Sequence, residues 1–217
     1  MNLSRCKLSK KQQVKLLEFF VLEVTARSAA NMLGLQANTA ALFYRKIREV
    51  IVHHLSLQAQ EVFMGSIELD ESYFGGVRKG RRGRAAAGKT IVFGILKRGG
   101  KVYTQVVPNA KASTLLPIVA RKVAPDSVVY TDSFRSYNAL DVSRFHHHRI
   151  NHSERFGAGK NHINGVENFW NQAKRVLRKY NGIAASNFHL FIKECEFRFN
   201  HGSPSEQLKT LRKWADI

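Results

Sequence analysis

Apolar residues repeat at helical spacing through residues 8–55 of the chain. Val14, Leu17 and Val21 follow one another at intervals of three and four residues, which puts them on one side of a helix. Phe20 lies beside this stripe and widens it. The pattern predicts that the chain begins with a segment made only of helices.

Within this segment a short helix, a glycine turn and a longer helix follow one another in TARSAANMLGLQANTAALFYRKIREVI. Thr25 is suited to cap the first helix and Gly34 to end it, and Asn38 or Thr39 is suited to cap the second. This order is that of a helix-turn-helix motif, although an ordinary pair of helices has the same pattern. The candidates for contact with DNA lie on or next to the second helix: Asn38, Thr39, Tyr44, Arg45 and Arg48.

From about residue 62 the pattern changes to the alternation of apolar and polar residues that is typical of strands. In SIELDESYF the apolar Ile67 and Leu69 alternate with acidic residues. Two more strand-like runs, KTIVFGILKR and KVYTQVVPN, are separated by Gly99 and Gly100, which predicts a hairpin.

Helices and strands alternate in the rest of the chain. We predict a short helix in ASTLLPIVARKV, a buried strand in SVVYTDS, a helical turn in SYNALDVS, a strand in HHHRINHS, a helix over 161–180 and a last helix in FHLFIKECEFRFN. Three strands followed by this alternation are the order of an RNase H-like fold. The predicted class is therefore α/β, with a helix-turn-helix domain over residues 1–60 and an RNase H-like domain, a mixed sheet with flanking helices, over residues 61–217.

The charge of the chain indicates its partner. Lys and Arg total 35 against 16 Asp and Glu, which gives a net charge of +19 and a pI near 10.3. Such an excess favours a polyanion, and nucleic acid is the first candidate. The sequence has neither a long apolar span nor a signal peptide, so we expect no membrane association and a place in the cytoplasm. Cys6 and Cys195 are too few for a disulfide framework.

Three carboxylates lie where two strands and a helix can bring them together. Asp70 lies in the first strand, Asp132 ends the run VVYTD, and Glu167 lies on the helix over 161–180. A carboxylate among apolar residues is costly unless something pairs with it. Two Mg²⁺ (or Mn²⁺) ions held by these acids would activate one oxygen and stabilise the other when a phosphodiester is displaced in line. The alternatives are that Asp132 caps the next segment and that Glu167 lies on a solvated helix face.

Other residues near these acids extend the candidate site. Lys174 lies seven residues beyond Glu167, two turns along the same helix face, and can reach the same phosphate. Glu68 shares the face of Asp70 by alternation, and we expect it to support the metal ligands from behind. Trp170 is expected in the core rather than stacked on a base.

A basic segment follows the first strand. It carries five positive charges within seven residues, which suits a phosphate backbone, although a solvated hairpin has the same composition. Its candidate DNA-binding residues are Arg78, Lys79, Arg81, Arg82 and Arg84.

The chain resembles the short DDE insertion-sequence transposases of bacteria. The resemblance rests on ELDESYFGG, RKGRRGR, VFGILKRGGKV, VYTDS, INHS, HINGVENFW with the following AK, and KECEFRFN, in this order within residues 67–200. It implies that Asp70, Asp132 and Glu167 bind the metal ions and that Lys174 is the lysine seven residues after the last acid. His152 and His162 fall in matched motifs, and we expect them to bind phosphate or to support the metal ligands.

The resemblance also implies the activity. Water first cleaves at the 3′ end of the transposon, and the freed 3′-OH then attacks target DNA. The expected function is therefore a transposase that binds terminal inverted repeats, works on double-stranded DNA with Mg²⁺ or Mn²⁺, and acts as a homodimer or larger assembly in the nucleoid of a bacterium. Many relatives begin with a four-ligand zinc ribbon, whereas this chain has only Cys6 there, so end recognition rests on the helix-turn-helix region or the chain is a truncated copy.

Two rival functions share most of these features. A domesticated DNA-binding regulator would keep the fold without the chemistry, but the intact acids and lysine argue against it. A nuclease of the same fold would cleave DNA without joining it. Inverted repeats in the DNA around the gene would favour the transposase.

Overall fold

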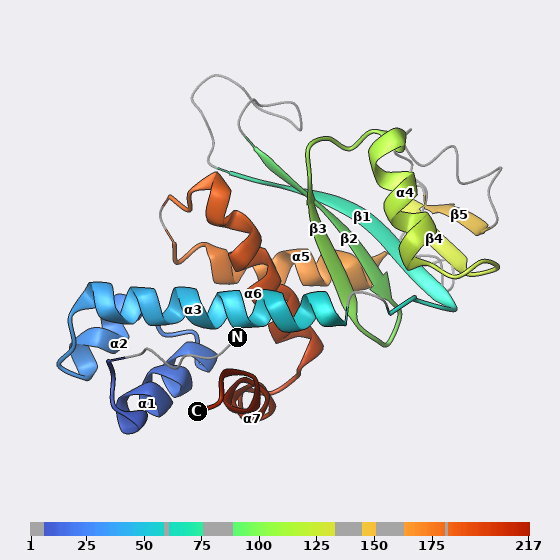
Figure 1. The fold of residues 1–217 in the computed structure, drawn as a ribbon. Coiled ribbons are helices and arrows are strands. Elements are labelled where there is room, and N and C mark those ends of the chain that lie inside the picture. Colours follow the sequence, from blue (N-terminus) through green and yellow to red (C-terminus); the bar gives the residue numbers. More distant parts are fainter. Residues whose placement is uncertain (1–6, 59–60, 76–88, 133–144, 151–162, 181) are drawn as a thin grey trace, which may run out of the picture. The chain divides into compact units, whose positions relative to one another are not determined.

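The computed structural model describes residues 7–58, 61–75, 89–132, 145–150, 163–180 and 182–217 (Figure 1). The chain divides into two compact units. Residues 60–172 form the first, which we call the sheet unit. Residues 1–59 together with 173–217 form the second, which we call the helical unit.

The sheet unit is built on a five-stranded mixed sheet with the order β3-β2-β1-β4-β5. The strands are β1 (Ser66–Phe74), β2 (Thr90–Lys97), β3 (Val102–Val107), β4 (Val128–Asp132) and β5 (His146–Ile150). β1, β2 and β3 pair antiparallel, whereas β4 is parallel to β1 and β5 is parallel to β4. The predicted α/β class with an RNase H-like mixed sheet is confirmed, and so is the hairpin at Gly99, whose φ of +67° suits glycine.

Two helices cover opposite faces of this sheet (Figure 1). One face packs against α4 (Ala112–Lys122). Its core holds Ile67, Leu69, Phe93, Ile95 and Val129 from the strands and Leu115, Ile118 and Val119 from α4. The other face packs against the first half of α5 (Asn164–Leu177), and it carries Glu68 and Asp70 of β1. Along α5 the apolar residues Val166, Phe169, Ala173 and Val176 repeat at helical spacing and are buried.

The helical unit begins with α1 (Lys10–Val21), α2 (Ala26–Met32) and α3 (Ala37–Leu57). As predicted, the Thr25 side chain caps α2 by accepting from the Ser28 N–H, and Gly34 takes a φ of +63° in the turn after α2. The predicted start of the next helix, capped by Asn38 or Thr39, is wrong by two or three residues. α3 begins at Ala37 after Gln36, whose side chain makes no capping hydrogen bond.

The unit continues with the end of α5 and with α6 (Phe188–Asn200) and α7 (Pro204–Ala215). Leu16, Phe20 and Ile47 share one buried cluster with Phe197 of α6 and Leu211 of α7. The last two helices therefore complete the core of the first three helices. The predicted domains, residues 1–60 and 61–217, did not anticipate this packing. α7 was not predicted, although Ser203, Pro204 and Glu206 carry its start signal, a capping box with proline at the first position.

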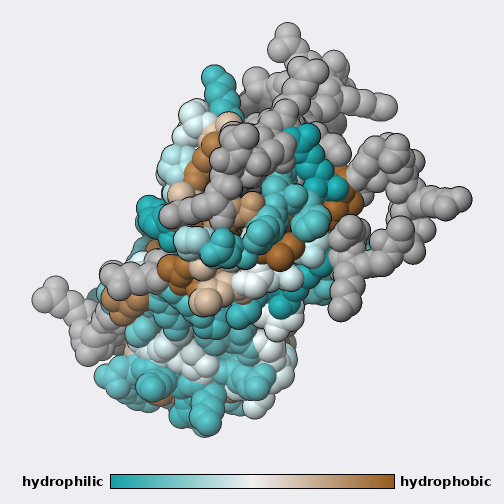
Figure 2. Space-filling view, turned by 90° about the vertical axis from the view of Figure 1, so that its right-hand side faces the viewer, coloured by the Kyte–Doolittle hydropathy of each residue, from teal (hydrophilic) through white to brown (hydrophobic). Residues whose placement is uncertain are grey.

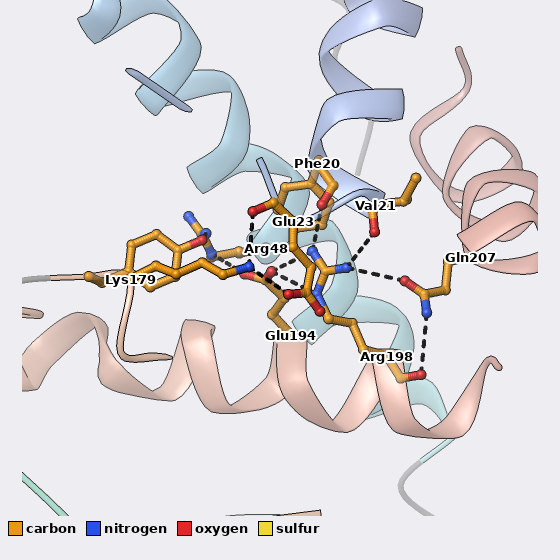
Figure 3. Close-up of polar contacts among 9 residues, drawn as sticks. Phe20, Val21, Glu23, Arg48, Lys179, Glu194, Arg198 and Gln207 are labelled. Carbon is orange, nitrogen blue, oxygen red and sulfur yellow. Dashed lines mark hydrogen bonds and ion pairs between the residues drawn. The ribbon is translucent and has the colours of Figure 1, made fainter. Parts of the chain in front are cut away.

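A buried ionic network connects these helices (Figure 3). The two carboxylate oxygens of Glu194 in α6 accept from Arg48 of α3 at 2.6 Å and from Arg198 at 2.7 Å. Arg198 also donates to the carbonyl oxygens of Phe20 and Val21 at the end of α1, at 2.7 and 3.0 Å. The network therefore satisfies carbonyl groups that the end of α1 leaves without helical partners.

The described surface seen in Figure 2 is mostly hydrophilic, with apolar residues in small separate patches. Within the described residues, no helix has the length and apolar character that would be needed to span a membrane.

Candidate active site

Asp70 and Asp132 lie side by side on neighbouring parallel strands. Each paired residue of β4 lies 62 positions beyond its partner in β1, as in Ser66 with Val128 and Glu68 with Tyr130. The same interval separates Asp70 from Asp132, so continuing the register sets the two residues opposite each other. Parallel strands lie about 4.8 Å apart and residues in register point to the same face. The sheet therefore brings the two predicted aspartates together.

The electrostatics of Asp70 agree with this placement. Burial, together with the charges of Glu71 and Asp132, raises the pKa of Asp70 from its ordinary 3.8 to about 7. A carboxyl that resists ionisation next to a second carboxylate is a place where a cation is favoured, because the cation removes both the desolvation cost and the repulsion.

Trp170 fastens the acid-bearing helix α5 to β1. Its indole N–H donates to Oδ2 of Asp70 at 3.0 Å, and its ring packs edge-on to Phe74. The ring lies against Gly94 of β2, the residue directly opposite Asp70 in the sheet. A Cβ at Gly94 would come within 2.6 Å of the Trp170 ring, so only glycine leaves room for it. Trp170 is a core residue, as predicted, and it also orients the carboxylate of Asp70.

Glu68 fastens the start of the same helix. Its Oε2 accepts from the backbone N–H of Val166 at 2.9 Å, and its Oε1 accepts from Arg98 at 2.8 Å. Gly165 permits this contact, since a Cβ there would lie 2.8 Å from Oε2 of Glu68. A carboxylate at the first turn of a helix is also favoured by the helix dipole. Glu68 therefore acts on the position of α5, a more specific role than its place in the alternating strand had indicated.

Arg98 is the residue of this region that the sequence did not reveal. It follows β2, pairs with Glu68, and lies over the Tyr130 ring at 3.6 Å. The signal for it in the sequence was weak: a buried acid such as Glu68 needs a basic partner, but nothing in the spacing indicates which of the 35 basic residues supplies it.

Glu167 and Lys174 lie on α5 as predicted, Glu167 in its first turn and Lys174 in its last. Glu167 follows Val166, which Glu68 holds, and precedes Trp170 by less than one turn. Within the described ranges, no three His, Cys, Asp or Glu side chains are grouped so that they could hold a metal ion. The structure thus brings Asp70 and Asp132 together and does not gather all three acids into a ligand cluster.

The predicted DNA-facing residues of α3 divide into two groups. Asn38, Thr39 and Arg45 are exposed. Tyr44 and Arg48 are 1% and 5% exposed, and the prediction that they face DNA is corrected. Both point into the helical unit, where Tyr44 packs against Phe20 and Arg48 pairs with Glu194.

Several predicted residues lie outside the described part of the chain. They are Arg78, Lys79, Arg81, Arg82 and Arg84 of the basic segment, and His152 and His162. The helical turn predicted in SYNALDVS lies there as well.

The packing of α5 on β2 can be tested with one methyl group. Gly94→Ala is expected to lower the free energy of unfolding by about 1–3 kcal/mol, because the added Cβ overlaps the Trp170 ring and the packed core cannot absorb it. The measurement is urea unfolding of the full chain. Gly100→Ala is the matched control, since the atoms nearest its Cβ belong to the flexible Lys97 side chain at 3.3 Å. Equal stability of the two variants would contradict the packing described for Trp170.

Comparison with known proteins identifies the family. Residues 62–200 match the model of the ISXO2-like transposase domain. Over 113 residues the chain is 58% identical to an uncharacterized transposase-like protein of Haemophilus influenzae, a match that covers 52% of this chain and 92% of that protein. It is 26% identical over 171 residues to an uncharacterized protein in transposable element ISH50 of Halobacterium salinarum, covering 70% of this chain and 58% of the relative.

Solved structures give only distant likenesses. The Mos1 strand transfer complex matches with a TM-score of 0.39 at 12% identity, covering 96% of this chain and 76% of that one. A Mos1 transposase paired-end complex matches with a TM-score of 0.41 at 12% identity, covering 97% and 77%. At this level they carry no weight for the chemistry of the site. The family match spans well over half of the chain, from residue 62, shortly before β1, to residue 200 at the end of α6. The chain therefore belongs to the ISXO2-like transposase domain family.

Proposed function

We propose that this chain binds the terminal inverted repeats of an insertion sequence and catalyses metal-dependent DNA cleavage and strand transfer through Asp70, Asp132 and Glu167. The observation that carries the proposal is the shared register of β1 and β4, which supports a paired role for the two aspartates. The docking of α5 by Trp170 and Glu68 supports the addition of Glu167, since both anchors lie within one turn of it.

The residues fit a divalent metal site. Mg²⁺ and Mn²⁺ prefer carboxylate oxygens, and the raised pKa of Asp70 reflects its burial and the charges of Glu71 and Asp132. Asp70, Asp132 and Glu167 are the residues that would hold the two ions. When bound, such ions activate the attacking oxygen and stabilise the leaving oxygen of a phosphodiester.

The chain's own residues would position the reactants. The indole N–H of Trp170 holds the carboxylate of Asp70 in one orientation, and Glu68 holds the start of α5. Lys174, exposed on α5 two turns beyond Glu167, would bind the scissile phosphate as a point charge. Pre-oriented groups of this kind lower a reaction barrier because their ordering has already occurred in folding.

DNA recognition would fall to two basic regions. The exposed Asn38, Thr39 and Arg45 of α3 are the candidates for contact with the inverted repeat. The segment that contains Arg78, Lys79, Arg81, Arg82 and Arg84 is suited to bind the phosphate backbone without regard to sequence. Because two transposon ends must be held together, the working form would be a homodimer or a larger assembly.

Metal binding should depend on pH in a way that Asp70 determines. Because the pKa of Asp70 is raised in the folded protein, the fold is more stable at low pH, where the buried carboxyl is protonated. This contribution to the free energy of unfolding is lost as pH rises through about 7. A cation beside the ionised carboxylate restores the stability that ionisation removes. Because Asp70 is ionised to a greater extent at pH 8 than at pH 6, Mg²⁺ should raise the unfolding temperature of the full chain more at pH 8. Asp70→Asn is expected to remove the difference. An equal Mg²⁺ effect at both pH values would contradict a metal site at Asp70.

The proposed activity is tested with the full chain, Mg²⁺ or Mn²⁺, and a labelled duplex that ends in the inverted repeat flanking the gene. Cleavage at the 3′ end followed by joining of the labelled strand to a target plasmid is the expected result. Cleavage without joining would assign the chain to the nucleases. Binding without cleavage in either metal would favour the catalytically silent DNA-binding regulator.

A further inference from the structure

A cavity of about 600 Å³ is lined only by residues of the helical unit. Its walls come from the start of α2, from residues 41–48 of α3, from the segment after α5 and from α6. The volume is within the range of about 300–1,000 Å³ that is typical of sites for small ligands. The acids proposed to bind metal do not line this cavity, whereas three residues that the sequence had assigned to DNA contact, Tyr44, Arg45 and Arg48, do.

The lining combines basic and aromatic side chains. Arg27, Arg45, Arg48 and Lys179 line it, and among the described residues that line it none is acidic. Arg45 and Lys179 pair with Glu49 and Glu23 from outside the lining. Partly exposed pairs of this kind contribute little to stability, so an incoming phosphate can exchange for the carboxylates at low cost.

The aromatic part of the lining is Tyr44, Tyr180 and Phe191. Tyr180 and Phe191 meet edge to face with their ring centroids 4.9 Å apart. The guanidinium of Arg48 lies over Phe191 at 4.0 Å, so a flat, delocalised group already occupies one face of that ring. Positive charge interleaved with aromatic rings is the arrangement by which proteins hold single nucleotides of a nucleic acid strand.

Tyr44 adds a polar group that needs an explanation. The residue is 1% exposed, lines the cavity, and its hydroxyl has no hydrogen-bond partner in the described part of the chain. Burial raises the pKa of Tyr44 above its ordinary value, so the hydroxyl stays protonated and can donate. A buried donor without an acceptor costs about 1–3 kcal/mol.

We infer that this cavity is a nucleotide-binding site, with the base against Tyr180 and Phe191 and the phosphate at Arg27, Arg45 and Lys179. The nucleotide is either an unpaired residue of a DNA strand or a free mononucleotide. The site needs no metal ion and lies in a different unit from Asp70 and Asp132. Nucleotide binding can therefore be tested in EDTA, which removes divalent metal ions. Under this condition the result does not depend on whether the proposed metal-dependent cleavage is correct.

The experiment uses the full chain and the fluorescence of 2-aminopurine, which falls when the base stacks on an aromatic ring. One probe is a duplex of random sequence with a single overhanging 2-aminopurine nucleotide, and the other is 2-aminopurine deoxyribonucleoside monophosphate. Ala41→Trp fills the cavity from an exposed position of α3 that lines it. Leu42→Trp is the matched control, because Leu42 is 56% exposed and does not belong to the lining.

We expect quenching by the native chain and by Leu42→Trp, and at least tenfold weaker binding of the probe by Ala41→Trp. Arg27→Gln should weaken the monophosphate about tenfold while leaving the corresponding nucleoside unchanged. Quenching by the overhang alone would identify a DNA strand as the source, and quenching by the monophosphate would identify a free nucleotide. No quenching by the native chain, or equal binding by Ala41→Trp and Leu42→Trp, would overturn the inference.

Discussion

Asp70→Asn, Asp132→Asn and Glu167→Gln are each expected to lower DNA cleavage by roughly 10³-fold or more, with DNA binding and folding retained. Each change keeps the shape of the side chain and removes one negative metal ligand. Metal stabilisation of the transition state supplies several kcal/mol, and each ~1.4 kcal/mol corresponds to a factor of ten in rate. The measurement is cleavage of a labelled end duplex in Mg²⁺ or Mn²⁺, with binding followed by gel shift.

The structure supplies a better control for these variants than a neighbouring acid. Glu71 is 7% exposed and its charge acts on Asp70, so its replacement would disturb the site. Asp126→Asn removes the same charge from an exposed turn just before β4, whereas Asp132 ends that strand. Asp126 has a φ of +62°, a conformation that Asn also adopts readily. We expect this variant to cleave at the native rate.

Two outcomes would change the assignment of the acids. If Glu167→Gln cleaves normally while substitutions at Glu154 or Asn168 abolish cleavage, the third acid has been misassigned. Native cleavage by all three acid variants would overturn the two-metal proposal. Lys174→Ala should give an intermediate loss, since it weakens the hold on the phosphate and leaves the metal ligands in place.

Glu194→Ala is expected to destabilise the helical unit by about 3–5 kcal/mol, because it leaves the guanidinium groups of Arg48 and Arg198 buried without their counter-ion. Burial acts to raise the pKa of Glu194, but the charges of Arg198 and Arg48 outweigh it and the pKa lies below the ordinary value. The stabilisation is therefore present above the ordinary pKa and is lost as pH falls through the lowered one. Urea unfolding of the full chain at neutral pH measures the effect.

The matched control is Glu49→Ala. Glu49 also pairs with an arginine of α3, but the Arg45 side chain is 56% exposed and that of Glu49 is 30% exposed. Such pairs contribute about 0–1 kcal/mol. A loss below about 1 kcal/mol for Glu194→Ala, equal to the control, would show that water or another group compensates the two arginines.

The same network predicts that residues 1–60 alone are poorly folded, because Arg48 would lack Glu194 and the end of α1 would lack Arg198.

Most elements of the fold could be predicted from local patterns. The strands SIELDESYF and KTIVFGILKR, the hairpin at Gly99 and the helix that carries Glu167 all appear close to their predicted places, because periodicity and turn residues act within a few positions of the chain. The errors among local features were small. The start of α3 was misplaced since Gln36 gives no side-chain signal, and α7 was missed although its capping box is visible in the sequence.

The candidate site was only half accessible from the sequence. Asp70 and Asp132 could be recognised because charged residues within strand-like runs need a reason to be there. Tyr44 and Arg48 were assigned to DNA because a helix rich in Tyr and Arg resembles a recognition helix. Whether those side chains point outward depends on which helix faces meet, and here that is decided by contacts with Phe20 and Glu194.

By itself the sequence determined most of the strands and helices, the excess of positive charge, and the acids that we propose as metal ligands, since each of these follows from residue type and short-range spacing. Only the tertiary structure decided the register of β1 with β4, which sets Asp132 beside Asp70 when it is continued, the fit of Trp170 against Gly94, and the packing of α6 and α7 on the first three helices. The physical reason is that these features are contacts between segments far apart in the chain. Which of many possible contacts forms depends on burial and on the space that every other segment leaves.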